Sequence, residues 1–289
     1  MKFILLLFLY SASVVAAEKT EIVMGFNPAE NAASMETKSK ALSDYFESHI
    51  GVKVKIFVAT DYTALIEAMR SGNIDLAWLP PFSYVQAEKM AHAKVLLKIV
   101  RHGRSDMFSA IITRTDRHLN TLHDLKGKSI AWVDPASASG HIIPKAAVIE
   151  KEKVDPDIFF GKQVFAGGHD AVVLAVYNGT VDAGATWLND KFGKDGAWNL
   201  YLKKDSDKIH VSFISEAIPT DTLATTELFS TKNPALLAKT VSLLQSMSKD
   251  EAGGKVLRDL YGIDALIPAK NSDYDIIRRA AVATGISKK

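Results

Sequence analysis

The amino-acid sequence predicts an α/β protein with two lobes, each built on a sheet of largely parallel strands. Stretches with helical spacing alternate with short apolar strands from residue 22 to about residue 214, an order typical of parallel sheets crossed by helices. This pattern runs through twice, and no Pro/Gly/Ser linker separates the two sets. We therefore expect two lobes that share crossing strands rather than two domains on a tether.

In the first set, Leu42, Phe46 and Ile50 recur four residues apart and are followed by Gly51. This spacing predicts an amphipathic helix over 37–49 with a glycine stop. Apolar residues alternate with other residues from 52 to 58, as in a half-buried strand. The same criteria predict strands at 22–28, 74–79, 94–101 and 107–113, and helices at 61–71 and 82–91.

The second set has strands at 129–133, 163–165, 181–186 and 208–214 and helices at 139–151 and 170–178. The tail differs, because three helical stretches follow one another with almost no strand signal between them: 234–248, 250–261 and 273–284. We expect all three to pack on the first lobe. The candidate crossing strands are Ala110–Arg114 and Thr222–Thr226.

Composition excludes several classes of protein. The chain has 289 residues, 47% of them hydrophobic and 24% charged, which is an ordinary globular balance with enough length for a sizeable core. The 35 Lys and Arg residues nearly balance the 33 Asp and Glu residues, so a globally basic nucleic-acid-binding protein is excluded. Because the chain has no cysteine, it has no disulfide, Cys-ligated metal or Cys nucleophile.

The segment from Met1 to Ala17 has the layout of a secretory signal. Lys2 provides the positive start, Phe3–Tyr10 form a short apolar run, and small residues lead to the cleavage site expected after Ala17. The alternative is a membrane anchor, but the apolar run is short for a bilayer core of roughly 30 Å. We expect an exported, free soluble protein that does not span the membrane.

The segment 131–144 is the first candidate binding site. A strand ends at Asp134 and a helix begins near Ser139, with small hydroxyl residues and Gly140 between them. Free N–H groups at a helix start, a favourable dipole and short hydroxyl side chains suit an anion. The alternative is that Ser137 or Ser139 only caps the helix.

Three further helix starts follow strand ends. They begin near Asp61, where Tyr62 lies in the first turn, near Phe82, followed by Tyr84, and near His169, preceded by two glycines. Each alone is compatible with ordinary capping or packing. Together they favour a small anion, because ligands of open α/β sheets lie at the carboxyl ends of the strands. His169 and Asp170 lack the spacing of a metal site, and no nucleotide-binding or esterase motif is present.

Five motifs then occur in order across almost the whole mature chain: G-F-N-P-A-E-N (25–31), F-V-A-T-D-Y (57–62), D-L-A-W-L-P-P-F-S-Y-V (75–85), V-D-P-A-S-A-S-G (133–140) and G-G-H-D-A-V-V-L-A-V (167–176). In these motifs the chain resembles the periplasmic binding proteins of ABC importers for phosphonate, phosphite and related phosphate oxyanions. The resemblance implies a type II periplasmic binding protein-like fold with two crossing strands. Lobe 1 would comprise 18–112 and 222–289, lobe 2 would comprise 113–221, and the ligand would lie between them.

Carried over motif by motif, the resemblance implies that Tyr62 contacts the ligand from lobe 1 and that His169 donates to it from lobe 2. It further implies an oxyanion held by Ser137, Ser139 and the N–H groups from Ala138 to Gly140. Two positions depart from the family pattern: Ala138 stands where Thr is frequent, and Met107 stands in a position commonly occupied by an aromatic residue.

Asp221 matches a carboxylate that follows Ile-Pro in the family. A carboxylate beside an anion is favourable if the ligand carries a P–OH proton for it to accept, whereas sulfate at neutral pH has no such proton. The alternative is a hinge-loop residue or helix cap.

The leading hypothesis is capture of a phosphorus oxyanion for import, without a cofactor or a metal. The chain would be a monomer that docks on an ABC permease of the inner membrane. A sensory protein that presents its closed form to a receptor or sensor kinase is the alternative with the same cleft. A periplasmic phosphatase is the third hypothesis, but Ser137 has no base other than His141 or His169 in the pattern, and no oriented triad can be argued.

Overall fold

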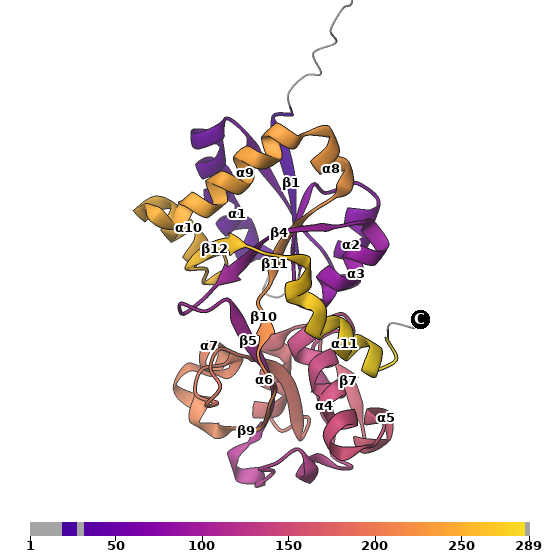
Figure 1. The fold of residues 1–289 in the computed structure, drawn as a ribbon. Coiled ribbons are helices and arrows are strands. Elements are labelled where there is room, and N and C mark those ends of the chain that lie inside the picture. Colours follow the sequence, from indigo (N-terminus) through magenta and orange to yellow (C-terminus); the bar gives the residue numbers. More distant parts are fainter. Residues whose placement is uncertain (1–18, 28–31, 287–289) are drawn as a thin grey trace, which may run out of the picture.

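Two lobes make up the computed structural model of the protein, which describes residues 19–27 and 32–286. Each lobe is built on a six-stranded sheet, and α11 (Asp275–Ala283) runs between the lobes on one side (Figure 1). The predicted secretory signal and residues 28–31 of the first motif lie outside the described residues. Among the described residues, no helix is both long and apolar enough to cross a membrane.

The first sheet has the strand order β12-β4-β11-β3-β1-β2. Its strands are β1 (Glu21–Phe26), β2 (Lys53–Val58), β3 (Leu76–Leu79), β4 (Lys94–Val100), β11 (Thr222–Thr225) and β12 (Ala265–Pro268). The helices of this lobe are α1 (Ala32–Ile50), α2 (Tyr62–Arg70), α3 (Pro81–Ala91), α8 (Glu227–Lys232), α9 (Pro234–Ser246) and α10 (Glu251–Tyr261).

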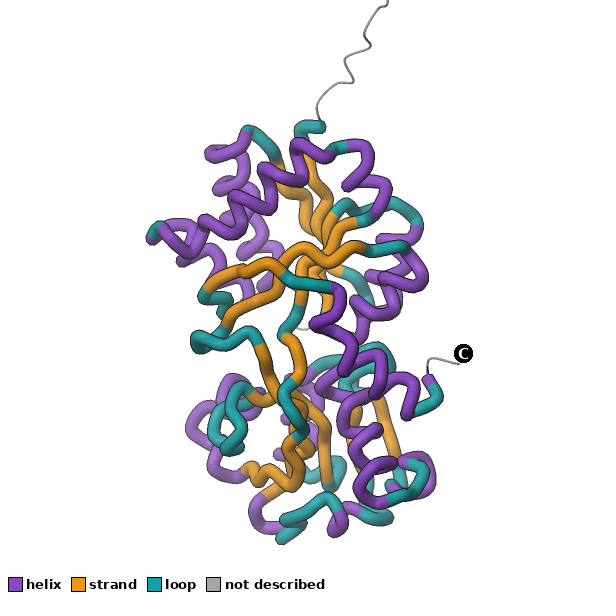
Figure 2. Tube along the Cα trace, viewed as in Figure 1, coloured by secondary structure: helices purple, strands orange, loops and turns teal. Residues whose placement is uncertain are grey.

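The second sheet has the order β10-β5-β8-β6-β7, with β9 paired to β5. Its strands are β5 (Asp106–Arg114), β6 (Ile130–Trp132), β7 (Gln163–Phe165), β8 (Ala183–Leu188), β9 (Ile209–Ile214) and β10 (Ile218–Pro219). A π-helical turn (Ala138–Ile142) precedes α4 (Ile143–Glu152), and the other helices of this lobe are α5 (Pro156–Phe159), α6 (His169–Tyr177) and α7 (Ala197–Leu202). Figure 2 shows the helices packed around both sheets.

Local chemistry fixes several helix ends near the interlobe cleft. The Asp61 carboxylate caps α2 by accepting from the Ala64 N–H at 2.7 Å. Pro81 occupies the first position of α3, where a missing N–H costs nothing. α6 begins at His169, two residues after Gly167, which lies in the left-handed region (φ +87). These ends follow β2, β3 and β7, so they lie at the carboxyl edges of the sheets.

Both sheets are mixed, so the expectation of largely parallel sheets is wrong. Parallel pairing is confined to β1 with β2 and β3, and β6 with β7 and β8. β11 returns from the other lobe and runs antiparallel to β3 and β4, and β5 enters the second sheet antiparallel to β8 and β9. A strand that arrives from the opposite lobe enters the sheet against the direction of its neighbours, which sequence periodicity does not reveal.

The chain changes lobes between β4 and β5 and again between β10 and β11. β5 pairs only with strands of the second sheet, so the boundary drawn from the sequence at residue 112 lies inside a strand of that sheet. The candidate crossing strand Ala110–Arg114 is therefore a central part of the second lobe. The segment 222–226 contains β11, which lies in the first sheet.

The C-terminal tail contains two corrections. β12 lies between the second and third helical stretches, where almost no strand signal was found, and it adds an edge strand beside β4. α9 and α10 pack on lobe 1, but α11 packs against α3 of lobe 1 and α4 of lobe 2. Ile277 and Ala281 of α11 are buried in a cluster dominated by lobe 2 residues, so the expectation that all three helices cover the first lobe is wrong for the third.

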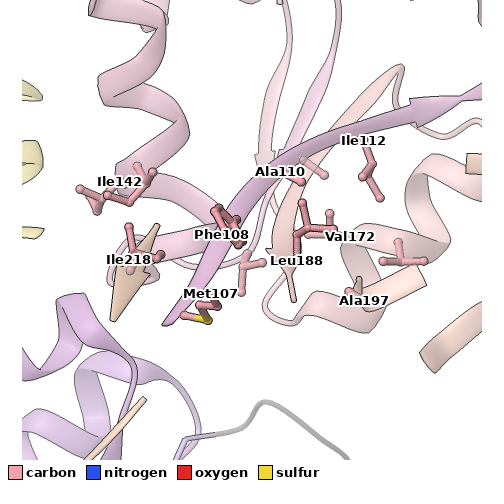
Figure 3. Packing of buried hydrophobic residues seen from close by; sticks show 14 of the residues in the cluster. Met107, Phe108, Ala110, Ile112, Ile142, Val172, Leu188, Ala197 and Ile218 are labelled. Carbon is pink, nitrogen blue, oxygen red and sulfur yellow. The ribbon is translucent and has the colours of Figure 1, made fainter. Parts of the chain in front are cut away.

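That cluster also connects the lobes. It contains Tyr62 and Phe82 from lobe 1 together with Met107, Ala136 and Ala138 from lobe 2, all buried. Figure 3 shows Met107 and Phe108 at the start of β5 beside Ile218 of β10, near the ends of the crossing segments. Apolar side chains of the two lobes are therefore in contact close to the crossing segments.

His141 gives the second lobe a testable pH dependence. Its Nδ1 donates to the Pro135 carbonyl at 3.0 Å, so Nε2 carries no proton, and it has no hydrogen-bond partner in the described part of the chain. The ring lies edge-on to Trp132 and Phe165. Burial, the largest cause, lowers the pKa of His141 to about 4, with Lys145 also lowering it and the Pro135 carbonyl and Asp157 opposing.

Because the folded-state pKa of His141 lies below the unfolded value of about 6.5, its neutral form stabilises the fold fully above pH 6.5 and this stability is lost as pH falls toward 4. We expect His141→Asn, which keeps a donor for Pro135, to remove roughly 2–3 kcal/mol of the stability change between pH 7 and 4.5. Urea unfolding at both pH values measures this. An equal change in the free energy of unfolding between the two pH values for wild type and His141→Asn would contradict the assignment.

Candidate ligand-binding cleft

A cleft of about 480 Å³ lies between the lobes. Seven of the nine residues predicted from the sequence line it: Tyr62, Met107, Ser137, Ala138, Ser139, His169 and Asp221. They come from the start of α2, the start of β5, the turn after β6, the start of α6 and the crossing segment before β11. Residues that are 45 to 159 positions apart from Tyr62 therefore share one cavity.

The turn after β6 is held rigidly. The Ser137 hydroxyl accepts from the Gly140 N–H at 3.1 Å, so Ser137 is the cap that the sequence offered as the simpler alternative, and it also lines the cleft. The Ser139 carbonyl accepts from the Ser109 hydroxyl at 2.6 Å. As a cap, Ser137 uses one lone pair, and its hydroxyl proton remains available to a ligand.

Gly140 does not line the cleft, although the sequence placed it among the candidate site residues. Its N–H is used by Ser137, and a Cβ at this position would lie 2.3 Å from Cγ2 of Val133. Glycine is required here because the turn passes directly against the end of β6. Gly140 shapes the site rather than facing it.

Tyr62 is a buried neutral donor. Only 1% of its surface is exposed, and burial, followed by the charges of Asp221 and Asp134, raises the pKa of its phenol well above the ordinary range. A hydrogen bond with the Asn27 side chain acts in the opposite direction. The phenol therefore keeps its proton at every physiological pH, and it can donate to an anion in the cleft.

His169 is also neutral. Its Nδ1 lies 2.9 Å from the hydroxyl of the fully buried Thr186, and burial, followed by the charge of Arg101, lowers its pKa to about 3. Since Thr186 can donate to Nδ1, the tautomer with the proton on Nε2 suits a donor that faces the cleft. His169 thus offers a hydrogen bond rather than a positive charge.

Asp221 brings a carboxylate to the same cleft, beside a cation. Arg101, directly after β4, lies 3.8 Å from it, measured from Nη1 to Oδ2. Burial raises the pKa of Asp221, and the charge of Arg101 opposes that rise. The pair spans the two crossing segments, so a hinge ion pair and a ligand contact are both compatible with its position.

Tyr84 is the second candidate that the structure does not bring to the cleft. Its ring packs edge-on against Tyr274, with centroids 4.8 Å apart, in the core of lobe 1. Tyr84 lies in the first turn of α3, but its side chain points into the core, because the opposite face of that turn meets the other lobe. The packing alternative from the sequence is correct here.

Several lining residues were not singled out from the sequence, among them Asn27, Arg101, Trp187 and Tyr201. Asn27 lies within the first motif, so that motif contained its signal. Arg101 follows an apolar strand, as other lining residues do. Its proximity to Asp221 arises because the two crossing segments lie side by side, which the sequence does not show. Among the described residues, no group of three or more His, Asp or Glu side chains is arranged to hold a metal ion.

The chain is similar to proteins of known class. The phosphate-import protein PhnD of Mycolicibacterium smegmatis is 29% identical over 289 aligned residues, covering 92% of this chain and 87% of the relative. A binding protein component of an ABC phosphonate transporter from Pseudomonas aeruginosa superposes with a TM-score of 0.80 at 23% identity, covering 93% of this chain and 87% of the other. A Prochlorococcus marinus protein in complex with methylphosphonate gives a TM-score of 0.77 at 20% identity, with 91% and 97% covered.

Those two structural similarities establish the periplasmic binding protein fold that the sequence predicted. The family model for periplasmic substrate-binding proteins of phosphonate ABC transporters matches residues 24–274. This range contains all the strands apart from the first three residues of β1, and it contains all the residues that line the cleft. Members of this family bind and deliver solutes and are not enzymes. The chain therefore belongs to the family of periplasmic substrate-binding proteins of ABC phosphonate transporters.

Proposed function

We propose that this protein captures a small phosphorus oxyanion, a phosphonate, phosphite or phosphate, between its lobes for import by an ABC transporter. The observation that carries this is the convergence of neutral hydrogen-bond donors on one cleft: Ser137, Ser139, Tyr62 and His169. A relative named for phosphate import and a structural neighbour in complex with methylphosphonate support this ligand class.

Neutral donors suit a protein that must release its ligand. A hydroxyl or imidazole N–H replaces water around the oxyanion without the long-range attraction of a buried cation. The ligand would bridge Tyr62 of lobe 1 and Ser137–Ser139 of lobe 2, so binding would favour the closed arrangement through contacts available only there. The closed form would then dock, as a monomer, on a permease in the inner membrane.

The segment 1–17 would direct the chain to the periplasm and be removed after Ala17. The Asp221 carboxylate would accept a hydrogen bond from a P–OH group and so disfavour sulfate, while Arg101 would limit the cost of its buried charge. No observation on the described residues favours the sensory alternative over import.

Isothermal titration with phosphate, phosphite, methylphosphonate and aminoethylphosphonate tests the ligand class. We expect at least one tight binder, because the donors are fixed in place before binding and little ordering is required. Sulfate is the matched control anion and should bind at least tenfold more weakly than the best of the four. Absence of binding across the whole panel would contradict the proposal.

Tyr62→Phe tests the donor role of the phenol. We expect the Kd for the preferred anion to rise about tenfold, since a hydrogen bond to a charged group contributes roughly 1.5–3 kcal/mol. Tyr84→Phe is the matched control: Tyr84 is equally buried on the neighbouring helix start but does not line the cleft, and its Kd should stay within about twofold of wild type. Equal effects of the two substitutions would exclude a direct role for Tyr62.

Asp221→Asn tests discrimination between anions. Asn retains the shape but offers an N–H in place of one acceptor, so we expect the preference for a protonated phosphorus oxyanion over sulfate to shrink by about tenfold or more. Competition titration with sulfate measures that ratio. Asp106→Asn, at the start of β5 and outside the cleft, should leave the ratio unchanged, and an unchanged ratio in Asp221→Asn would show that Asp221 serves only the hinge.

A further inference from the structure

One turn of lobe 2 is tied to the start of a lobe 1 helix. The Ser83 hydroxyl, in the first turn of α3, donates to the Ala136 carbonyl at 3.1 Å. Ser83 is fully buried and Ala136 is 1% exposed. Because α3 belongs to lobe 1 and Ala136 follows β6 of lobe 2, this hydrogen bond exists only while the lobes are together.

A second contact joins the same turn to α2. The Asp134 carboxylate accepts from the Ala136 N–H at 2.7 Å, and it also faces the Tyr62 backbone N–H, whose hydrogen bonding counteracts the rise in pKa that burial causes at Asp134. Tyr62 is the first residue of α2, where N–H groups have no partner within the helix. A carboxylate of lobe 2 therefore lies close enough to the positive end of a lobe 1 helix for its charge to interact favourably with that end.

These contacts are linked to the ligand site by the chain itself. The turn 134–137 runs directly into Ser137, Ala138 and Ser139, which line the cleft, whereas neither Ser83 nor Asp134 does. Apolar packing surrounds the turn, since Ala136 and Ala138 share a buried cluster with Phe82 of lobe 1. Opening the lobes would expose Ser83 and Asp134 to water and separate the turn from both helix starts.

We propose that Ser83 and Asp134 are positioning residues that latch the second-lobe turn onto the first lobe and so set how long a ligand is retained, without selecting which anion binds. This inference rests on the proposed function. The ligand should dissociate more slowly than the cleft contacts alone would allow, because the latch contacts must break before the lobes open and the ligand leaves.

Ser83→Ala is the direct test. Loss of one interlobe hydrogen bond should raise the Kd about three- to tenfold. Most of the change should lie in the dissociation rate, followed by stopped-flow fluorescence with Trp187 as a reporter at the cleft. The Kd ratios among phosphate, phosphite and methylphosphonate should stay within twofold of wild type. A Kd unchanged in Ser83→Ala, or a changed order of preference, would overturn the latch.

Ser212→Ala is the matched control. Ser212 is also buried, and its hydroxyl donates to the Leu119 carbonyl at 2.5 Å within lobe 2. This substitution should lower the melting temperature but leave the Kd and the dissociation rate near wild type. If Ser212→Ala weakens binding as much as Ser83→Ala, the effect reflects general stability and the proposal fails.

A second pair of variants tests Asp134. Asp134→Asn keeps one oxygen acceptor, which can serve the Ala136 N–H, and should weaken binding less than Asp134→Ala, which removes every acceptor and should behave like Ser83→Ala. Binding that is weakened equally by Asn and Ala would point to the charge of Asp134 rather than to the latch, and would overturn its assignment.

Interlobe distance separates failure of the latch from failure of the proposed function. The chain has no cysteine, so Asn73→Cys in lobe 1 and Lys126→Cys in lobe 2, both at exposed positions, accept one spin label each. If the latch exists, Ser83→Ala shifts the distribution of distances between the two labels toward longer values than in wild type under identical conditions. This shift is expected even if the wild-type protein binds none of the anions in the panel. Identical distributions for the two proteins would overturn the latch, whereas absent binding by wild type alone would overturn only the ligand class.

Discussion

The turn between β6 and α4 must satisfy its own backbone while serving two lobes. Within the turn, the Ala136 N–H donates to the Asp134 carboxylate and the Gly140 N–H donates to the Ser137 hydroxyl. What remains is directed outward: the Ala136 carbonyl toward Ser83 of lobe 1, and Ser137 and Ser139 toward the cleft. Glycine at 140 permits this compact path, because any side chain would meet Val133.

Burial decides the electrostatics around this turn. Tyr62 and His169 are both kept neutral, one by a raised and the other by a lowered pKa, since desolvation disfavours the charged form in each case. On the side of Ser137, the cleft consequently offers an anion neutral hydrogen-bond donors rather than positive charges. Among the charged residues that line the cleft, Arg101 and Asp221 form an ion pair on the crossing segments, where the two charges offset each other.

The lobes are connected by more than the two crossing segments. α11 lies against α3 and α4, and its buried Ile277 shares a cluster with residues of both lobes. Any motion that opens the cleft must slide or bend this third connection, which runs between the lobes (Figure 1). Such packing favours two discrete arrangements over continuous deformation, because close-packed apolar surfaces do not part gradually.

The sequence by itself determined most of the helices and strands, although not β12, and which of their ends carry donors. Periodicity and glycine or proline positions are local properties, so α2, α3, α6 and the turn after β6 could be located, and the motifs placed Tyr62, Ser137, Ser139 and His169 in one site. Tertiary structure decided what depends on distant pairing. It turned Tyr84 into the core, placed β5 entirely in lobe 2, and brought Arg101 to Asp221 and Ser83 to Ala136. Side-chain direction at a helix start and the partner of a crossing strand are set by packing between segments more than fifty residues apart, which no local pattern records.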